Sequence, residues 1–211
     1  MKTTRPSAIV SRRTILKKLH GFSLIEVLVT LLLVTIGVLG MVAMQARAIQ
    51  YTQDSVQRNA AVDLAGELVE LMRANPSELF TSVPPTQPVA SGLKDSSLFY
   101  KGRGGNFSPA PTTPTDGDCA PPVAAASKDP EKQRDCWLSR VEQTLPGASD
   151  LMTEHFYICR SSAASSGAAP TCDGKGSVLE IQLAWSVKPG ACPDDRAPNE
   201  TTCIYRTRVE L

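Results

Sequence analysis

The chain has 211 residues, of which 42% are hydrophobic, and it carries 22 basic against 21 acidic residues. This near-neutral balance argues against a general nucleic-acid-binding protein, which would carry a clear excess of Lys and Arg. The length allows one modest hydrophobic core in addition to a membrane segment.

The first 21 residues form a leader that is basic and contains no Asp or Glu. An apolar segment follows over residues 22–44, and its only polar members are Ser23, Glu26, Thr30 and Thr35. At about 1.5 Å per residue this segment spans roughly 34 Å as a helix, which is enough to cross a bilayer. Because the positive flank precedes it, we expect the N-terminus to stay cytoplasmic and the rest to be exported.

Glu26 is the unusual residue of the apolar segment. An acidic side chain costs about 2.5–3.5 kcal/mol at the centre of a bilayer on translocon scales, and less near an interface. It therefore needs a cationic partner, and the candidate is a free α-amine on Phe22, released by cleavage after Gly21. The alternative is a plain signal anchor with a stray Glu, but the basic leader, Gly21, Phe22 and Glu26 all fall in one register.

The stretch from Gly21 to Val29, which reads GFSLIEVLV, resembles the class III signal of type IV pilins and pseudopilins. The resemblance implies that a prepilin peptidase cuts after Gly21 and methylates Phe22. It implies that Glu26 aligns the subunit in a growing filament. It also implies a bacterial inner-membrane protein, single-pass with a periplasmic C-terminus, that later joins a pilus. The long leader and the absence of proline from the apolar helix favour a minor pilin over a major one.

After residue 44 the helical pattern continues but becomes amphipathic, and Asn75-Pro76 is expected to end it. Residues 76–130 hold 10 of the 16 prolines, which predicts a long loop. Asp129-Pro130 is typical of a helix start, and the short helix that follows would bury Trp137, Leu138, Val141 and Leu145 before Pro146-Gly147.

Three β-rich runs cover residues 153–160, 178–187 and 203–211, and a fourth strand is conceivable near residues 97–100. The expected fold class is α+β. In this type IV pilin fold, the C-terminal half of a long N-terminal helix packs on an antiparallel sheet in a disulfide-stabilised head. The expected organisation is a leader (1–21), a long helix (22–75) with its transmembrane half at 22–44, and a periplasmic or extracellular head (76–211).

All six cysteines lie in the part of the chain that would be exported: Cys119, Cys136, Cys159, Cys172, Cys192 and Cys203. An even number of cysteines in an oxidising compartment indicates disulfides, although six cysteines allow 15 pairings. We favour sequential pairing because each pair brackets a loop rich in Pro, Gly or Ser. A zinc site is disfavoured because there is no C-x-x-C pair and His155 is the only histidine after the leader.

The sequence shows no catalytic constellation and predicts neither an enzyme nor a cofactor site. His155 is interpreted as an exposed or structural histidine. Asp194 and Asp195, with Asn199 and Glu200, could hold calcium, but the EF-hand spacing is missing, so a solvated acidic loop is the preferred interpretation. A membrane-anchored periplasmic enzyme remains the alternative from another functional class.

Beyond the signal, several features together resemble the type IV pilus modification protein family PilV: the Asn75-Pro76 stop, the Cys136-Trp137 helix, and the strands with Trp185 and Cys203-x-Tyr205. The resemblance implies a minor pilin that primes pilus assembly in a tip complex and supports twitching motility and adhesion. The implied partners are the prepilin peptidase, the inner-membrane assembly platform, and the major and other minor pilins, contacted through N-terminal helices. The alternative is a minor pseudopilin of type II secretion, which shares the signal and the helix.

Overall fold

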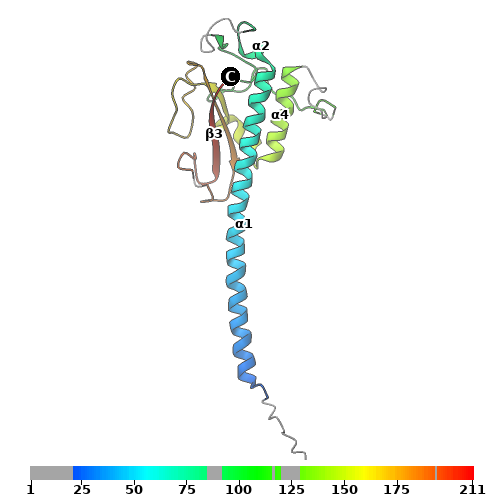
Figure 1. Cartoon of the computed structure of the whole chain (residues 1–211), viewed down its shortest axis with the longest axis vertical. Coiled ribbons are helices and arrows are strands. Elements are labelled where there is room, and N and C mark those ends of the chain that lie inside the picture. The colour runs from blue at the N-terminus through cyan, green and yellow to red at the C-terminus, as the bar shows by residue number, and fades with distance from the viewer. Residues whose placement is uncertain (1–20, 85–91, 116, 120–128, 193) are drawn as a thin grey trace, which may run out of the picture. The chain divides into compact units, whose positions relative to one another are not determined.

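A computed structural model describes residues 21–84, 92–115, 117–119, 129–192 and 194–211 (Figure 1). The predicted leader therefore lies outside the described residues, except for Gly21, and so do parts of the proline-rich region. The chain divides into two compact units, Met1–Ala46 and Arg47–Leu211, and each is considered by itself below.

Helix α1 (Leu24–Ala74) crosses both units and agrees closely with the predicted helix. It ends where the sequence indicated, because Pro76 cannot continue it and the Asn75 side chain donates to the Leu71 carbonyl at 2.8 Å. A single turn, α2 (Pro76–Leu79), follows, with Pro76 at its start.

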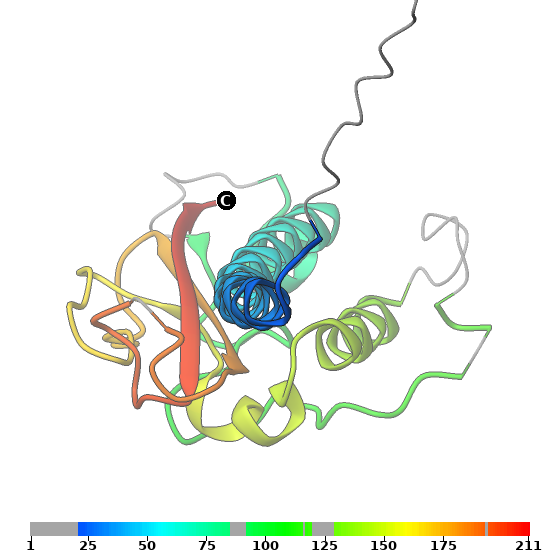
Figure 2. The same ribbon diagram turned by 90° about the horizontal axis from the view of Figure 1, so that it is seen from below.

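The sheet has three antiparallel strands in the order β1 (Tyr157–Arg160), β2 (Val178–Ser186) and β3 (Thr202–Glu210). The part of α1 that belongs to the second unit lies between this sheet and α4 (Pro130–Thr144) (Figure 2). Buried side chains from the helix and from the central strand β2 form one core: Ala61, Leu64, Leu68, Leu179, Ile181, Leu183 and Trp185. The predicted α+β pilin-like architecture is confirmed.

Helix α4 begins as predicted, with Pro130 in its first turn and the Asp129 carboxylate accepting a hydrogen bond from the Glu131 amide at 3.0 Å. Its expected apolar residues are all buried: Trp137, Leu138, Val141 and Leu145. The Trp137 indole donates to the Leu64 carbonyl at 2.9 Å, which fixes α4 against α1.

One predicted strand starts too early. Residues 153–155 belong to helix α5 (Ala148–His155), and β1 begins only at Tyr157. Helix α5 begins after Gly147, which adopts φ +67°, a left-handed conformation that glycine tolerates. A Cβ at this position would also overlap the Ser186 side chain, so no larger residue fits there. The buried Lys101 ammonium donates to the Thr153 and Phe156 carbonyls at 2.9 and 3.0 Å, which satisfies the end of α5.

The fourth strand expected near residues 97–100 is wrong. This segment is a turn, and only the next residue, Lys101, pairs with the sheet, through an isolated bridge to Ile158.

The proline-rich chain around this segment is held by a buried charged pair that the sequence did not suggest. Arg134 bonds Asp135 and the Leu98 and Pro109 carbonyls, and Asp135 in turn accepts from Thr112.

The outer face of the sheet is also covered. Apolar and polar residues alternate along β2, a pattern typical of one buried and one solvent-facing side, yet Glu180 and Gln182 are both buried. Residues 161–176 fold back over them, because Arg206 donates to the Gln182 side chain and to the Ser165 and Gly167 carbonyls.

The structure joins all six cysteines in the sequential pairs Cys119–Cys136, Cys159–Cys172 and Cys192–Cys203. Each bond closes a loop of the head, over sequence separations of 17, 13 and 11 residues. The second one ties the covering segment 161–176 to the end of β1.

Candidate assembly site

The junction that the sequence singled out lies at the start of α1. Gly21, Phe22 and Ser23 precede the helix, and the Phe22 side chain is 83% exposed. The Ser23 carbonyl accepts from the amides of Glu26 and Val27, which begins the first turn. Gly21 and Phe22 are both exposed residues in the described part of the chain.

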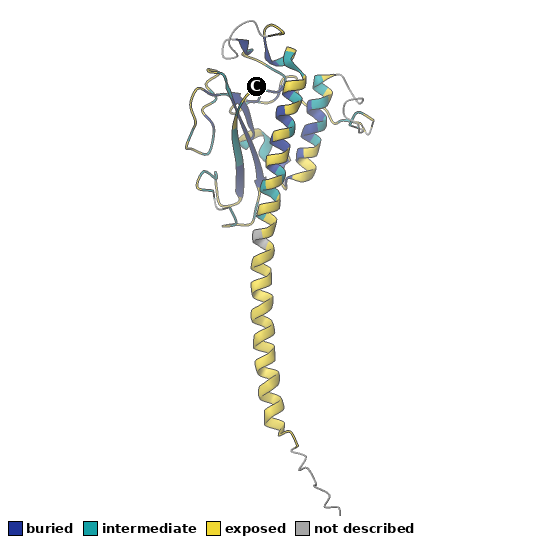
Figure 3. Cartoon of the chain, viewed as in Figure 1, coloured by how far each residue is buried: buried dark blue, intermediate teal, exposed yellow. Residues whose placement is uncertain are grey.

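Apolar side chains cover the first half of α1 on all sides. From Phe22 to Met44 the large hydrophobic residues of this unit are exposed (Figure 3). An 18-residue window within the helix has a mean hydropathy of 2.7, and by length and composition the helix could span a membrane. Such a surface is stable only in lipid or against other apolar helices.

The polar side chains of this segment are not equivalent. The hydroxyl of Thr30 donates to the Val27 carbonyl and that of Thr35 to the Leu32 carbonyl, at 2.9 and 2.8 Å, so neither needs an outside partner. The Glu26 carboxylate, in contrast, has no hydrogen bond to any residue that the structure describes, although the N-terminal turn of a helix favours an anion. Its carboxylate is free to bind a group from another molecule.

Gly37 and Gly40 are a second feature of the apolar segment. A Cβ placed on either glycine would meet no atom of the described chain within 4 Å. Packing within the subunit therefore does not require glycine at these positions. Because neither residue has a side chain, the helix surface is shallow at this point, and another helix could approach it closely.

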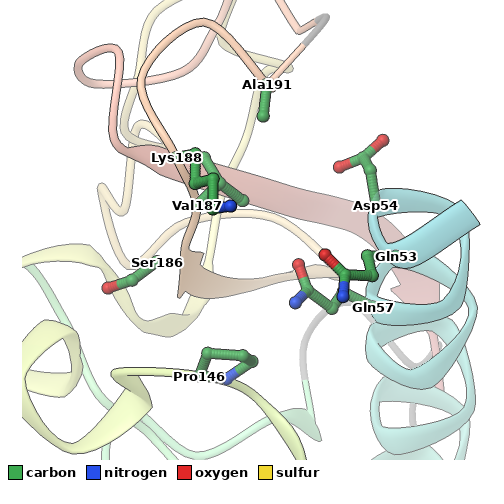
Figure 4. A pocket seen from close by; sticks show the side chains of 8 residues that line it. All are labelled: Gln53, Asp54, Gln57, Pro146, Ser186, Val187, Lys188 and Ala191. Carbon is green, nitrogen blue, oxygen red and sulfur yellow. The ribbon is translucent and has the colours of Figure 1, made fainter. Parts of the chain in front are cut away.

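Pocket geometry in the second unit does not indicate catalysis. One pocket lies beside α1 and is lined by Gln53, Asp54, Gln57, Pro146, Ser186, Val187, Lys188 and Ala191 (Figure 4). Its polar groups are two glutamine amides, the Ser186 hydroxyl, the Asp54 carboxylate and the Lys188 ammonium, and the Ser186 hydroxyl points away from the two charged groups (Figure 4). The two glutamines, one helical turn apart at i and i+4, are the sequence signal that could have located it.

Two of the four candidate calcium residues, Asp194 and Asn199, are bonded to neighbouring protein groups. Both carboxylate oxygens of Asp194 accept from the Arg196 guanidinium, at 3.1 and 3.0 Å, and these hydrogen bonds lower the pKa of Asp194. The Asn199 side-chain oxygen accepts from the amide and the hydroxyl of Thr201. Within the described residues, no group of three or more His, Cys, Asp or Glu could hold a metal ion.

His155 does not form a catalytic pair. It lies in the last turn of α5, where burial lowers the pKa of its imidazole. The neighbouring Glu154 carboxylate opposes this lowering of the pKa, while the Lys101 ammonium adds to it. This is the environment of a structural histidine.

Two family comparisons cover the first third of the chain. The prokaryotic N-terminal methylation motif matches residues 16–42, and the family described as type IV pilin Tt1218 matches residues 43–84. Over residues 16–84 the chain is type IV pilin-like. No curated protein and no solved structure gave a match.

The two matches support a role as a pilin or pseudopilin, and proteins of the pilin family are structural subunits. Such a role involves the assembly machinery and other pilins. The methylation motif and the apolar helix fit a pilin that is anchored in the inner membrane before it assembles into the pilus.

Proposed function

We propose that the protein is a minor pilin of the PilV type, which helps to prime pilus assembly in a tip complex and so supports twitching motility and adhesion. Its precursor is cleaved after Gly21, and Phe22 becomes the N-methylated first residue. Glu26 then binds the amine of a neighbouring subunit. The observation that carries this proposal is the Glu26 carboxylate, which lies in the first turn of an apolar helix without a described partner.

Electrostatic energy favours the paired charges over the isolated ones. A carboxylate in lipid is unfavourable by itself, and so is an isolated ammonium. Together at about 4 Å in a medium of low dielectric constant they attract strongly. A subunit that leaves the bilayer can therefore satisfy Glu26 only where a neighbour supplies its amine at the matching height. The charge thus sets the axial position of the subunit.

The test compares Glu26→Gln with Glu70→Gln in the full-length protein. Glu70 is an exposed acidic residue of the same helix whose only described ion pair is with Arg73. We expect both variants to be cleaved normally, but only the Glu26 variant to be missing from sheared pili. Normal incorporation of Glu26→Gln into pili would contradict the proposal.

Cleavage is tested separately by Gly21→Ala. A Cβ at Gly21 meets nothing within 4 Å, so the change does not disturb the described chain. The variant should keep the mass of the precursor, and a chain of mature size would show that cleavage after Gly21 is not the maturation step. Loss of pili without loss of protein secretion, in a strain that lacks the gene, separates the minor pilin from the type II pseudopilin.

A further inference from the structure

The two edges of the sheet differ in their hydrogen bonding. In β3 the odd-numbered residues face β2, because the Val187 amide donates to the Thr201 carbonyl at 2.8 Å and the register continues from that pair. In an antiparallel ladder the backbone groups of alternate residues point in opposite directions. The backbone groups of the even-numbered residues of β3 therefore point away from the sheet.

The far edge, formed by β1, is partly closed. The Lys101 amide donates to the Ile158 carbonyl at 2.8 Å, and the Ile158 amide donates to the Lys101 carbonyl at 2.9 Å. The beginning of β3 is closed as well, because the Thr202 amide donates to the Asn199 carbonyl at 3.4 Å. Local structure thus occupies the β1 edge at Ile158 and the beginning of β3.

The second half of β3 remains open. The outward backbone groups of Arg206, Arg208 and Glu210 have no hydrogen-bond partner within the described chain. Arg208 and Glu210 are exposed residues, while Arg206 is half-buried. An edge of this kind offers a row of donors and acceptors that matches an extended backbone.

Side-chain charge limits what can pair there. Arg208 lies opposite Glu180 on β2, and its only described hydrogen bond goes to the Ser161 carbonyl, so it can meet one more acceptor. The antiparallel pairing of two copies that uses all three open residues would set Arg208 against Arg208. Like charges directly opposite destabilise a sheet, whereas an acidic residue in that place stabilises it.

We propose that the open half of β3 binds an extended strand of a different polypeptide, which carries an acidic residue opposite Arg208. The strand continues the sheet through the backbone groups of Arg206, Arg208 and Glu210. This contact belongs to the head and goes beyond the helix-based assembly role, on which it does not depend.

The test uses the full-length protein in detergent micelles and two synthetic nine-residue peptides of alternating Thr and Val. One peptide has Asp at its centre and the other has Lys. Since the exchange turns an attraction into a repulsion, the Asp peptide should bind about 2- to 30-fold more tightly. Its binding should slow hydrogen exchange at the amides of Arg206, Arg208 and Glu210, and Arg208→Glu should reverse the preference.

Two variants separate the backbone from the side chain. Arg208→Pro removes an outward amide that makes no bond to β2, and Arg208→Ala removes the same side chain but keeps the amide. Far-UV circular dichroism checks that both fold. We expect Arg208→Ala to bind both peptides with no preference between Asp and Lys. Arg208→Pro should lose the binding of both peptides. The proposal is overturned by equal binding of the two variants or by unchanged exchange of the three amides with the Asp peptide. A dimer of this chain that Arg208→Pro dissociates would also overturn the proposal, because the open half of β3 would then bind a second copy.

Discussion

Two tryptophans of the head are buried to the same extent but differ in one hydrogen bond. Trp137 is 1% exposed and Trp185 is 0% exposed. The Trp137 indole donates to the Leu64 carbonyl at 2.9 Å, whereas the Trp185 indole nitrogen has no partner among the described residues. Substituting each by Phe removes the same atoms from the same core, so the pair isolates the contribution of that hydrogen bond.

The two effects should have opposite signs. Trp137→Phe loses a buried hydrogen bond with a net contribution of about 0.5–1.5 kcal/mol, while Trp185→Phe removes an unsatisfied buried donor and regains about 1–3 kcal/mol. Because the loss of packing is similar at both sites, the free energies of unfolding should differ by about 1.5–4.5 kcal/mol, with Trp137→Phe the less stable variant.

Urea unfolding of the oxidised full-length protein in detergent, followed by far-UV circular dichroism, measures this difference. With a typical urea dependence the two midpoints should lie about 1–2 M apart. Equal midpoints, or a lower midpoint for Trp185→Phe, would refute the assignment of the Trp137–Leu64 hydrogen bond as the contact that fixes α4 to α1.

Three further outcomes are expected. Replacing Cys159 and Cys172 together by Ser should lower the free energy of unfolding by about 3 kcal/mol in the chain-entropy model for a loop of this length, and an unchanged urea midpoint would contradict it. Hydrogen bonds from Ser162 and Lys175 lower the pKa of Asp173 to about 2. Because the folded pKa lies below the unfolded one, the stabilisation is complete above the ordinary value of 3.8 and is lost as the pH falls towards 2, so an NMR titration with a midpoint near 4 would rule it out. Gly37→Leu should leave the thermal unfolding of the head unchanged but reduce recovery of the protein in sheared pili, and normal recovery would show that no helix packs closely there.

Local sequence chemistry predicted the elements that local chemistry controls. Asp129 and Pro130 start α4 through a side-chain cap and a fixed φ, and Asn75-Pro76 ends α1, so both boundaries could be located from neighbouring residues. The three cysteine pairs are close in sequence, and the structure joins the sequential pairs that the bracketed loops rich in Pro, Gly or Ser favoured.

Features set by distant residues could not be predicted in this way. The end of α5 depends on Lys101, which is more than 50 positions away in the sequence. Its ammonium donates to the Thr153 and Phe156 carbonyls. Burial of Glu180 and Gln182 depends on a loop that Arg206 holds in place. In the assembly site the sequence located Glu26, but the partner proposed for its carboxylate belongs to another subunit, so a single chain leaves this pairing a prediction.

The most direct test of the assembly account is mass spectrometry of the N-terminal peptide of this protein, recovered from sheared pili. We predict a chain that begins at Phe22 and carries one added methyl group on its α-amine. A polypeptide that begins at Met1 and stays with the inner membrane would contradict the account, because Phe22 would then carry no free α-amine and the subunit would not have entered a pilus.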